Sequence, residues 1–218
     1  LITAEITRIR RGLDKLSIVI LKGNNEGFRF DNKGNNFEYN QTFLQNVIIP
    51  SFYLMPSVES INWCDLKEIN NINYDINEIF PRGYNVNYPE WIYPTILGNE
   101  LPPAHLRGDN VGYFEAPLYA KNWVEKYINN NFNNKKIITL TLREITKFDP
   151  KNLRTIEKVK WEKIFENFLS KGYQPLIVRD TNNVFDSKNF FDEIPEFPSA
   201  SLNIAIRIAL YEKSFLNF

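Results

Sequence analysis

Two short apolar runs constrain the fold of this chain most strongly. They are LSIVIL, residues 16–21, and IITLTL, residues 137–142. Continuous apolar runs of this length are typical of parallel strands that helices cover on both faces. The remaining elements predicted from residue spacing are strands over Val58–Cys64 and Leu176–Val178, and helices over residues 1–13, 40–55, 117–131, 158–170 and 199–214. Strands that alternate with helices in this way predict βαβ units and mainly parallel sheets.

A proline-rich segment over residues 70–117 separates the two groups of elements. A structureless loop of this length is unusual inside one compact domain. We therefore predict an α/β protein of two Rossmann-like lobes. The first is residues 1–115, which include this crossing segment, and the second is residues 116–218.

The helix predicted over residues 199–214 is apolar on most of its faces, yet only four residues follow it. A helix of this kind needs cover on most sides. We therefore expect the C-terminal lobe to be incomplete, with an apolar patch of several hundred Å² beside the helix. Either a homodimer buries this patch or the patch stays exposed.

Composition excludes several classes of function. Lys and Arg together number 26, as do Asp and Glu, so nothing predicts nucleic-acid binding. No apolar run approaches the roughly 18–20 residues of a membrane span. The start of the chain carries no secretory signal pattern, so we expect a cytoplasmic protein. The single cysteine, Cys64, excludes an internal disulfide, and its apolar neighbours indicate a buried, inert thiol.

Polar side chains follow the predicted strands where ligands bind in open parallel sheets, outside the carboxyl ends. Arg143 directly follows the strand of residues 137–142, so its guanidinium could bind a phosphate through two hydrogen bonds. An ion pair with Glu144 explains its position equally well. Asp180 could accept hydrogen bonds from a ribose or a base, or it could cap the following turn.

Other candidate features are weaker. The loop of residues 22–27 follows a strand but lacks the spacing of a dinucleotide-binding motif. His105, the only histidine, has no serine motif to work with, which leaves a hydrolase as a remote alternative. No acidic group has metal-ligand spacing, so we expect no metal. Trp123 and Trp161 fit the buried faces of helices. The basic residues of the first helix fit a solvated face or local ion pairs.

The stretch from Ile137 to Thr181 resembles a family of uncharacterised bacterial proteins related to glycosyltransferases. The motifs that carry the resemblance are Thr141-Leu142-Arg143-Glu144, Arg154, Trp161, Gly172-Tyr173 and Asp180-Thr181. Weaker similarity covers Arg10–Asp14, Lys22–Arg29 and Ile48–Ser57 in patches. Two features depart from the family pattern. Thr155-Ile156 replaces an Asn-Ser pair, and the chain stops at Leu216–Phe218, where the family continues.

The resemblance implies a two-lobed (GT-B type) glycosyltransferase that transfers sugar from a nucleoside-diphosphate sugar to an unknown acceptor. It places Arg143 on a phosphate and Asp180 near the nucleoside. Glu144, Arg154 and Thr181 complete the implied substrate-binding residues. The leaving diphosphate would be stabilised by positive charge and backbone N–H groups, without a metal or cofactor. The alternative is a non-catalytic Rossmann-like binding or interaction module.

Overall fold

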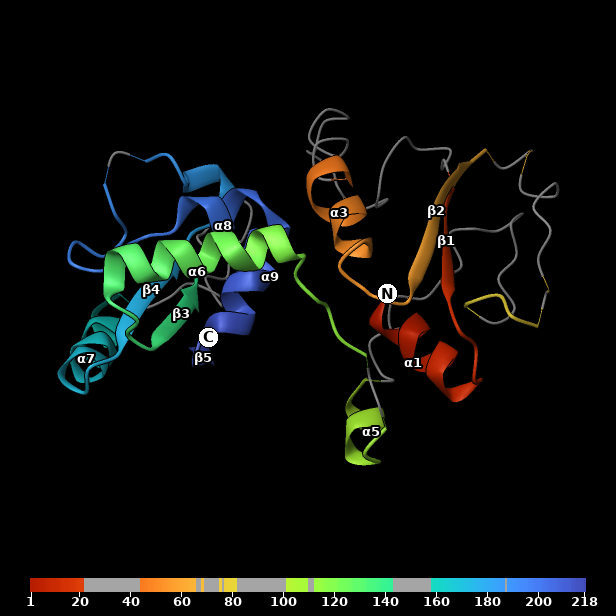
Figure 1. The fold of residues 1–218 in the computed structure, drawn as a ribbon, viewed down its shortest axis with the longest axis horizontal. Coiled ribbons are helices and arrows are strands. Elements are labelled where there is room, and N and C mark those ends of the chain that lie inside the picture. Colours follow the sequence, from red (N-terminus) through yellow and green to blue (C-terminus); the bar gives the residue numbers. More distant parts are fainter. Residues whose placement is uncertain are drawn as a thin grey trace. The chain divides into compact units, whose positions relative to one another are not determined.

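The structure, a computed structural model, is mixed α/β with two small parallel sheets (Figure 1). It describes residues 1–21, 44–65, 68, 75, 77–81, 101–109, 112–142, 158–186 and 188–218. The chain divides into two compact units, unit 1 (Leu1–Phe114) and unit 2 (Glu115–Phe218). Each unit is described by itself.

Unit 1 contains a two-stranded parallel sheet. Its described elements are α1 (Ile2–Arg10), β1 (Leu16–Leu21), a π-helical turn (Leu44–Ile48), α3 (Ile49–Phe52), β2 (Val58–Cys64) and α5 (Leu101–Leu106). Both predicted strands and their parallel pairing are confirmed, with Ile18 opposite Ile61. The predicted stop of the first helix is also confirmed, because Gly12 adopts a φ of +66° just after α1. Of the helix predicted over residues 40–55, only 44–52 are helical, and 40–43 lie outside the described residues.

The prediction that β1 is covered on both faces is wrong. Val19 is 37% exposed, although it lies inside the apolar run. Neighbouring strands of a parallel sheet point paired side chains to the same face, and Val19 pairs with Asn62. Ser17 pairs with Ser60 on this face, and their hydroxyls are 3.0 Å apart. The second strand therefore makes this face polar, which the run in β1 alone does not reveal.

Glu5 is a buried carboxylate on α1 that three donors hold in place. Arg8 donates to it through Nε at 2.8 Å and through Nη2 at 2.9 Å, and the Ser57 hydroxyl donates at 2.6 Å. The hydrogen bond from Arg8 is the largest cause of a lowered pKa of Glu5, and burial opposes it. The cluster joins α1 to the turn before β2.

This cluster predicts a pH dependence of stability. The folded-state pKa of Glu5 is lower than its ordinary value of 4.5, so the carboxylate contributes its full stabilisation above that pH. The contribution is lost as the pH falls through the lowered pKa. We expect urea midpoints measured between about pH 7 and pH 3 to fall more steeply for wild type than for Glu5→Gln. Parallel curves for the two proteins would contradict this assignment.

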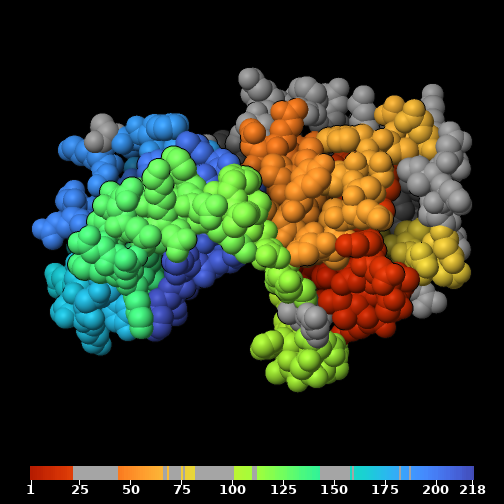
Figure 2. All heavy atoms as spheres, viewed as in Figure 1, coloured from red at the N-terminus to blue at the C-terminus, as the bar shows by residue number. Residues whose placement is uncertain are grey.

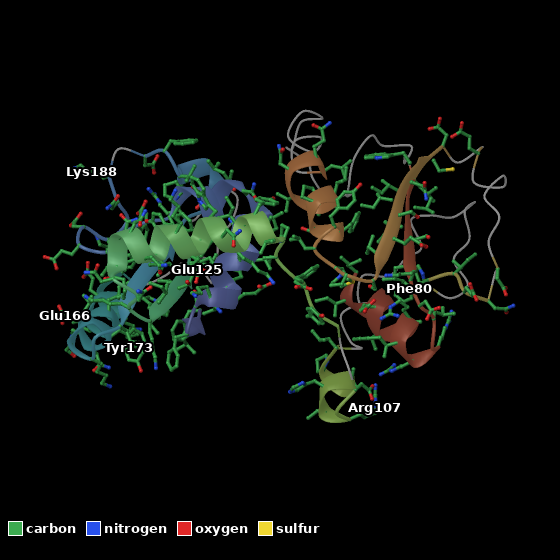
Figure 3. All side chains as sticks on the ribbon, in the orientation of Figure 1. Phe80, Arg107, Glu125, Glu166, Tyr173 and Lys188 are labelled. Carbon is green, nitrogen blue, oxygen red and sulfur yellow. The ribbon has the colours of Figure 1, made fainter. Side chains whose placement is uncertain are left out.

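The arginines of α1 form ion pairs, one of the two roles that the sequence pattern predicted. Arg8 pairs with Glu5, and Arg10 Nη2 lies 2.8 Å from Asp109 Oδ2. Arg107, labelled in Figure 3 just after α5, shares the same Asp109 oxygen at 3.1 Å. These contacts join α1 to the end of α5, so the basic run of α1 serves local structure.

Unit 2 contains a three-stranded parallel sheet in the order β4-β3-β5. Its described elements are α6 (Leu118–Phe132), β3 (Ile137–Thr141), α7 (Lys158–Ser170), β4 (Gln174–Val178), a 3₁₀ turn (Thr181–Asn183), α8 (Pro198–Leu202), α9 (Ile204–Lys213) and β5 (Leu216–Asn217). The central strand β3 pairs with β4 through Thr139 and Leu176, and with β5 through Thr139 and Asn217. The predicted strands at residues 137–142 and 176–178 are confirmed, as is their parallel pairing.

Helices cover the sheet of unit 2 on both faces. On one face Leu140, Leu142 and Ile177 form a buried cluster with Phe165 of α7 and with Phe191. On the other face the sheet meets α8 and α9, and α6 packs against α9 (Figure 1). This three-layer arrangement explains why β3 and β4 are buried over almost their whole length.

The predicted single helix over residues 199–214 is wrong in one respect, because it is two helices. Asn203 has an extended backbone, and its side-chain oxygen accepts hydrogen bonds from the N–H groups of Ala205 and Ile206. It thereby caps α9. α8 begins at Pro198 rather than at a Ser199 cap. The apolar patch beside this helix, buried in a homodimer or left exposed, stays a prediction.

Trp123 is not a core residue of α6, contrary to the prediction. Its side chain is 52% exposed, and the buried stripe of this helix consists of Ala120, Val124 and Ile128. These three positions are four residues apart, which is the spacing of one helix face. The corresponding prediction for Trp161 is confirmed, because its ring packs against the cluster around Phe165.

Candidate functional site

The carboxyl edge of the sheet in unit 2 is the candidate site. The connection from β3 to β4 runs through α7, and the connection from β4 to β5 runs through α8 and α9 on the opposite face. The two connections lead to strands on opposite sides of β3. In open parallel sheets, ligands bind outside the carboxyl ends at such a reversal of strand order.

Two of the five predicted site residues lie at this edge. Asp180 and Thr181 are the second and third residues after β4. Arg143, Glu144 and Arg154 lie outside the described residues. Their predicted roles therefore stay predictions.

Asp180 precedes the 3₁₀ turn but does not cap it with its side chain. The turn is closed by the backbone, with the Asn183 N–H donating to the Asp180 carbonyl at 3.0 Å. The Asp180 carboxylate is half-buried. Of the two roles predicted for Asp180, side-chain capping of this turn is wrong, and hydrogen bonding to a ligand stays a prediction.

Thr181 ties the end of β4 to α8. Its hydroxyl donates to the carbonyl of Ser201 at 3.1 Å. This bond fixes the position of the loop after β4 and uses the one proton of the hydroxyl. The Thr181 oxygen keeps an accepting lone pair for a donor on a ligand.

Arg179, the first residue after β4, is buried and structural. Only 5% of it is exposed, and its Nη2 lies 3.0 Å from Asp186. Its Nη1 donates to the carbonyl of Lys188, labelled in Figure 3, and lies 3.9 Å from Glu196. Arg179 thus connects the start of the loop after β4 to residues later in that loop, and so it fixes the backbone around Asp180.

Sequence reasoning missed Tyr211, whose hydroxyl lies 2.6 Å from that of Thr141 at the carboxyl end of β3. Three residues later, just after α9, comes Ser214, whose hydroxyl lies 2.6 Å from that of Thr139. α9 therefore runs antiparallel to β3. Its N-terminal half continues past the end of the strand and borders the candidate site. In the sequence, Tyr211 is indistinguishable from the apolar residues around it.

Arg207 lies on α9 one turn before Tyr211, on the same side of the helix. Its Nε donates to the carbonyl of Ala200 at 2.8 Å, and its Nη2 donates to that of Ser201 at 3.1 Å. The Ser201 carbonyl is the one that also accepts from Thr181. Arg207 therefore lies beside Thr181 at the carboxyl end of β4. The signal in the sequence was a single cation interrupting an apolar helix.

Among the residues that the structure describes, the other candidates give no second site, and the candidate loop of residues 22–27 lies outside the described residues. His105 is exposed on α5, and Cys64 is buried, which confirms the predicted buried thiol. Burial raises the pKa of the Cys64 thiol, and Glu68 and Asp65 raise it further, so little thiolate forms. Within the described ranges, no three His, Cys, Asp or Glu side chains gather closely enough to bind a metal ion. Among the described helices, none is both long and apolar enough to span a membrane.

Comparisons with protein-family models, with curated proteins and with solved structures found no match to this chain.

Proposed function

We propose that unit 2 is a Rossmann-like lobe that binds a phosphorylated ligand, and that the protein transfers sugar from a nucleoside-diphosphate sugar without a metal. The observation that carries the first part is the parallel order β4-β3-β5 with connections on opposite faces, which leaves Asp180 and Thr181 at the carboxyl edge. The motifs between Ile137 and Thr181 support the choice of a nucleotide-sugar.

In this proposal the chain supplies charge and orientation. The guanidinium groups of Arg143 and Arg154 stabilise the negative charge that develops on the leaving diphosphate. The Asp180 carboxylate accepts hydrogen bonds from the ribose hydroxyls. Buried Arg179 positions Asp180, because it fixes the loop that both residues begin.

The first test is Arg143→Lys. A lysine keeps the charge but loses the planar pair of donors, so we expect nucleotide binding to weaken by about 1–3 kcal/mol. Calorimetric titration of the full chain with a panel of nucleoside-diphosphate sugars measures this change. The melting temperature should hardly move. A large drop in melting temperature with unchanged affinity would instead identify Arg143 as the ion-pair partner of Glu144.

The second candidate function is a non-catalytic interaction module. It is favoured by three exposed apolar residues on α6: Leu118, Tyr119 and Trp123. Figure 2 shows α6, in green, at the surface that faces the viewer. If no nucleotide-sugar in the panel binds, the module is favoured. Uptake of one donor, followed by release of its nucleoside diphosphate, supports the enzyme.

A further inference from the structure

Arg207 is a half-buried arginine whose guanidinium contacts backbone carbonyls. It is on the N-terminal half of α9, which extends past the end of β3, and it lies next to Thr181 across the shared Ser201 carbonyl. Both of its hydrogen bonds are to neutral carbonyls at the end of α8. Within the described part of the chain, no carboxylate lies within ion-pair distance of its guanidinium.

The two carbonyl contacts orient the guanidinium and leave part of it available. A guanidinium has five N–H donors in one plane, and Arg207 uses one on Nε and one on Nη2. Both donors on Nη1 and one on Nη2 have no partner among the described residues. Adjacent donors of this kind match the oxygen atoms of a phosphate group.

We propose that Arg207 binds a phosphate group of the ligand at the carboxyl edge of the sheet. The assignment rests on the proposed function for the location of the ligand, and it adds a binding residue that follows from the fold rather than from the sequence motifs. Ala200 and Ser201 hold the charge in place before the ligand arrives, so little side-chain entropy is lost on binding. A positive charge that the described residues do not neutralise is available to a phosphate dianion.

The test is a calorimetric titration of the full chain with inorganic pyrophosphate. This probe carries neither sugar nor nucleoside, so its binding does not depend on the glycosyltransferase assignment. We expect Arg207→Gln to weaken pyrophosphate binding by about tenfold or more, the loss expected for a charge-assisted hydrogen bond. The matched control is Lys213→Gln. Lys213 is also on α9, but it is exposed and pairs with Glu125, labelled in Figure 3, at 3.1 Å.

Three results would overturn the assignment. They are equal losses in the two variants, unchanged affinity in Arg207→Gln, and no pyrophosphate binding by wild type. A lower melting temperature with unchanged affinity would show that Arg207 only caps the end of α8. If Arg207→Gln does not fold, wild type is modified with phenylglyoxal and mapped by mass spectrometry. Pyrophosphate should then slow the modification of Arg207 but not that of Arg107, and equal rates would overturn the assignment.

The two proposals can fail separately. If pyrophosphate protects Arg207 but no nucleotide-sugar binds, the phosphate site stands and the glycosyltransferase assignment is wrong. If a nucleotide-sugar binds and Arg207→Gln leaves its affinity unchanged, the donor assignment stands and Arg207 is not its phosphate-binding residue.

Discussion

Replacing Arg179 with leucine is expected to lower the free energy of unfolding of unit 2 by about 3–5 kcal/mol, the usual cost of breaking a buried ion pair by removing one partner. Glu196 would remain as a carboxylate whose side chain is only 10% exposed. It would keep one strong donor, the Phe190 N–H at 2.6 Å. The Lys188 carbonyl would also lose its donor. Hydrogen exchange of the β3 and β4 amides in the full chain measures the change.

Two further variants separate the contributions to this effect. Asp186 is 56% exposed, so Asp186→Asn should cost less than about 1 kcal/mol. Replacing both Arg179 and Glu196 with leucine also removes the unpaired carboxylate of Glu196, so the double variant should recover part of the free energy of unfolding that Arg179→Leu loses. If Arg179→Leu costs no more than Asp186→Asn, Arg179 does not hold the loop after β4.

Gly112→Ala should destabilise unit 1 by about 2–5 kcal/mol. Gly112 has a φ of +71°, which costs an alanine about 1–2 kcal/mol. An added Cβ would also overlap Glu5 Cγ and lie 3.3 Å from Glu5 Cδ. Glu5 cannot move freely, because Arg8 and Ser57 hold its carboxylate, and overpacking of this kind costs about 1–3 kcal/mol. Hydrogen exchange of the β1 and β2 amides measures the loss.

Gly108→Ala is the matched control. Gly108 has nearly the same φ, +72°, but no atom lies within 4 Å of an added Cβ. It should therefore show the backbone cost alone. Combining Gly112→Ala with Glu5→Ala removes the overlap, so the double variant should be less destabilised than the sum of the two single variants. Equal losses of stability in Gly108→Ala and Gly112→Ala would show that the Glu5 side chain moves away from the added Cβ at no cost in free energy.

The strands were predictable because each carries its own signal. Residues 137–142 are apolar or β-branched throughout, and β3 lies inside this run with helices on both faces. β1 shows the limit of such a signal. One of its faces is exposed to solvent because the partner strand places the polar residues Ser60 and Asn62 there, and the sequence of β1 alone does not reveal this. Asn203 shows another limit. Its side chain bonds to the backbone two and three residues later, which breaks the helix, but an asparagine also fits an unbroken helical pattern.

The candidate site was partly predictable for the same reason. Asp180 and Thr181 are the second and third residues after β4, and residues just past the end of a strand lie at the carboxyl edge of any parallel sheet. Arg207 and Tyr211 reach the same edge from a helix that follows β4 only after a long connection. The contact between Ser214 and Thr139 sets how α9 is aligned along β3, and this alignment decides which residues of α9 lie beyond the end of the strand. No local sequence pattern predicts this alignment.

The central position of β3 has a consequence for synthesis on the ribosome. Ile138 pairs with Pro175 on one side and with Leu216 on the other, so β3 leaves the ribosome long before its second neighbour. Until β5 is made, one side of β3 presents unpaired N–H and C=O groups, which can pair with another nascent chain. The hydroxyls of Thr139 and Thr141 also lack their hydrogen-bond partners, Ser214 and Tyr211, until α9 and the residue after it have been made. Polysomes that carry several copies of this chain would therefore place open strand edges close together, a situation in which chaperones that bind nascent chains are most useful.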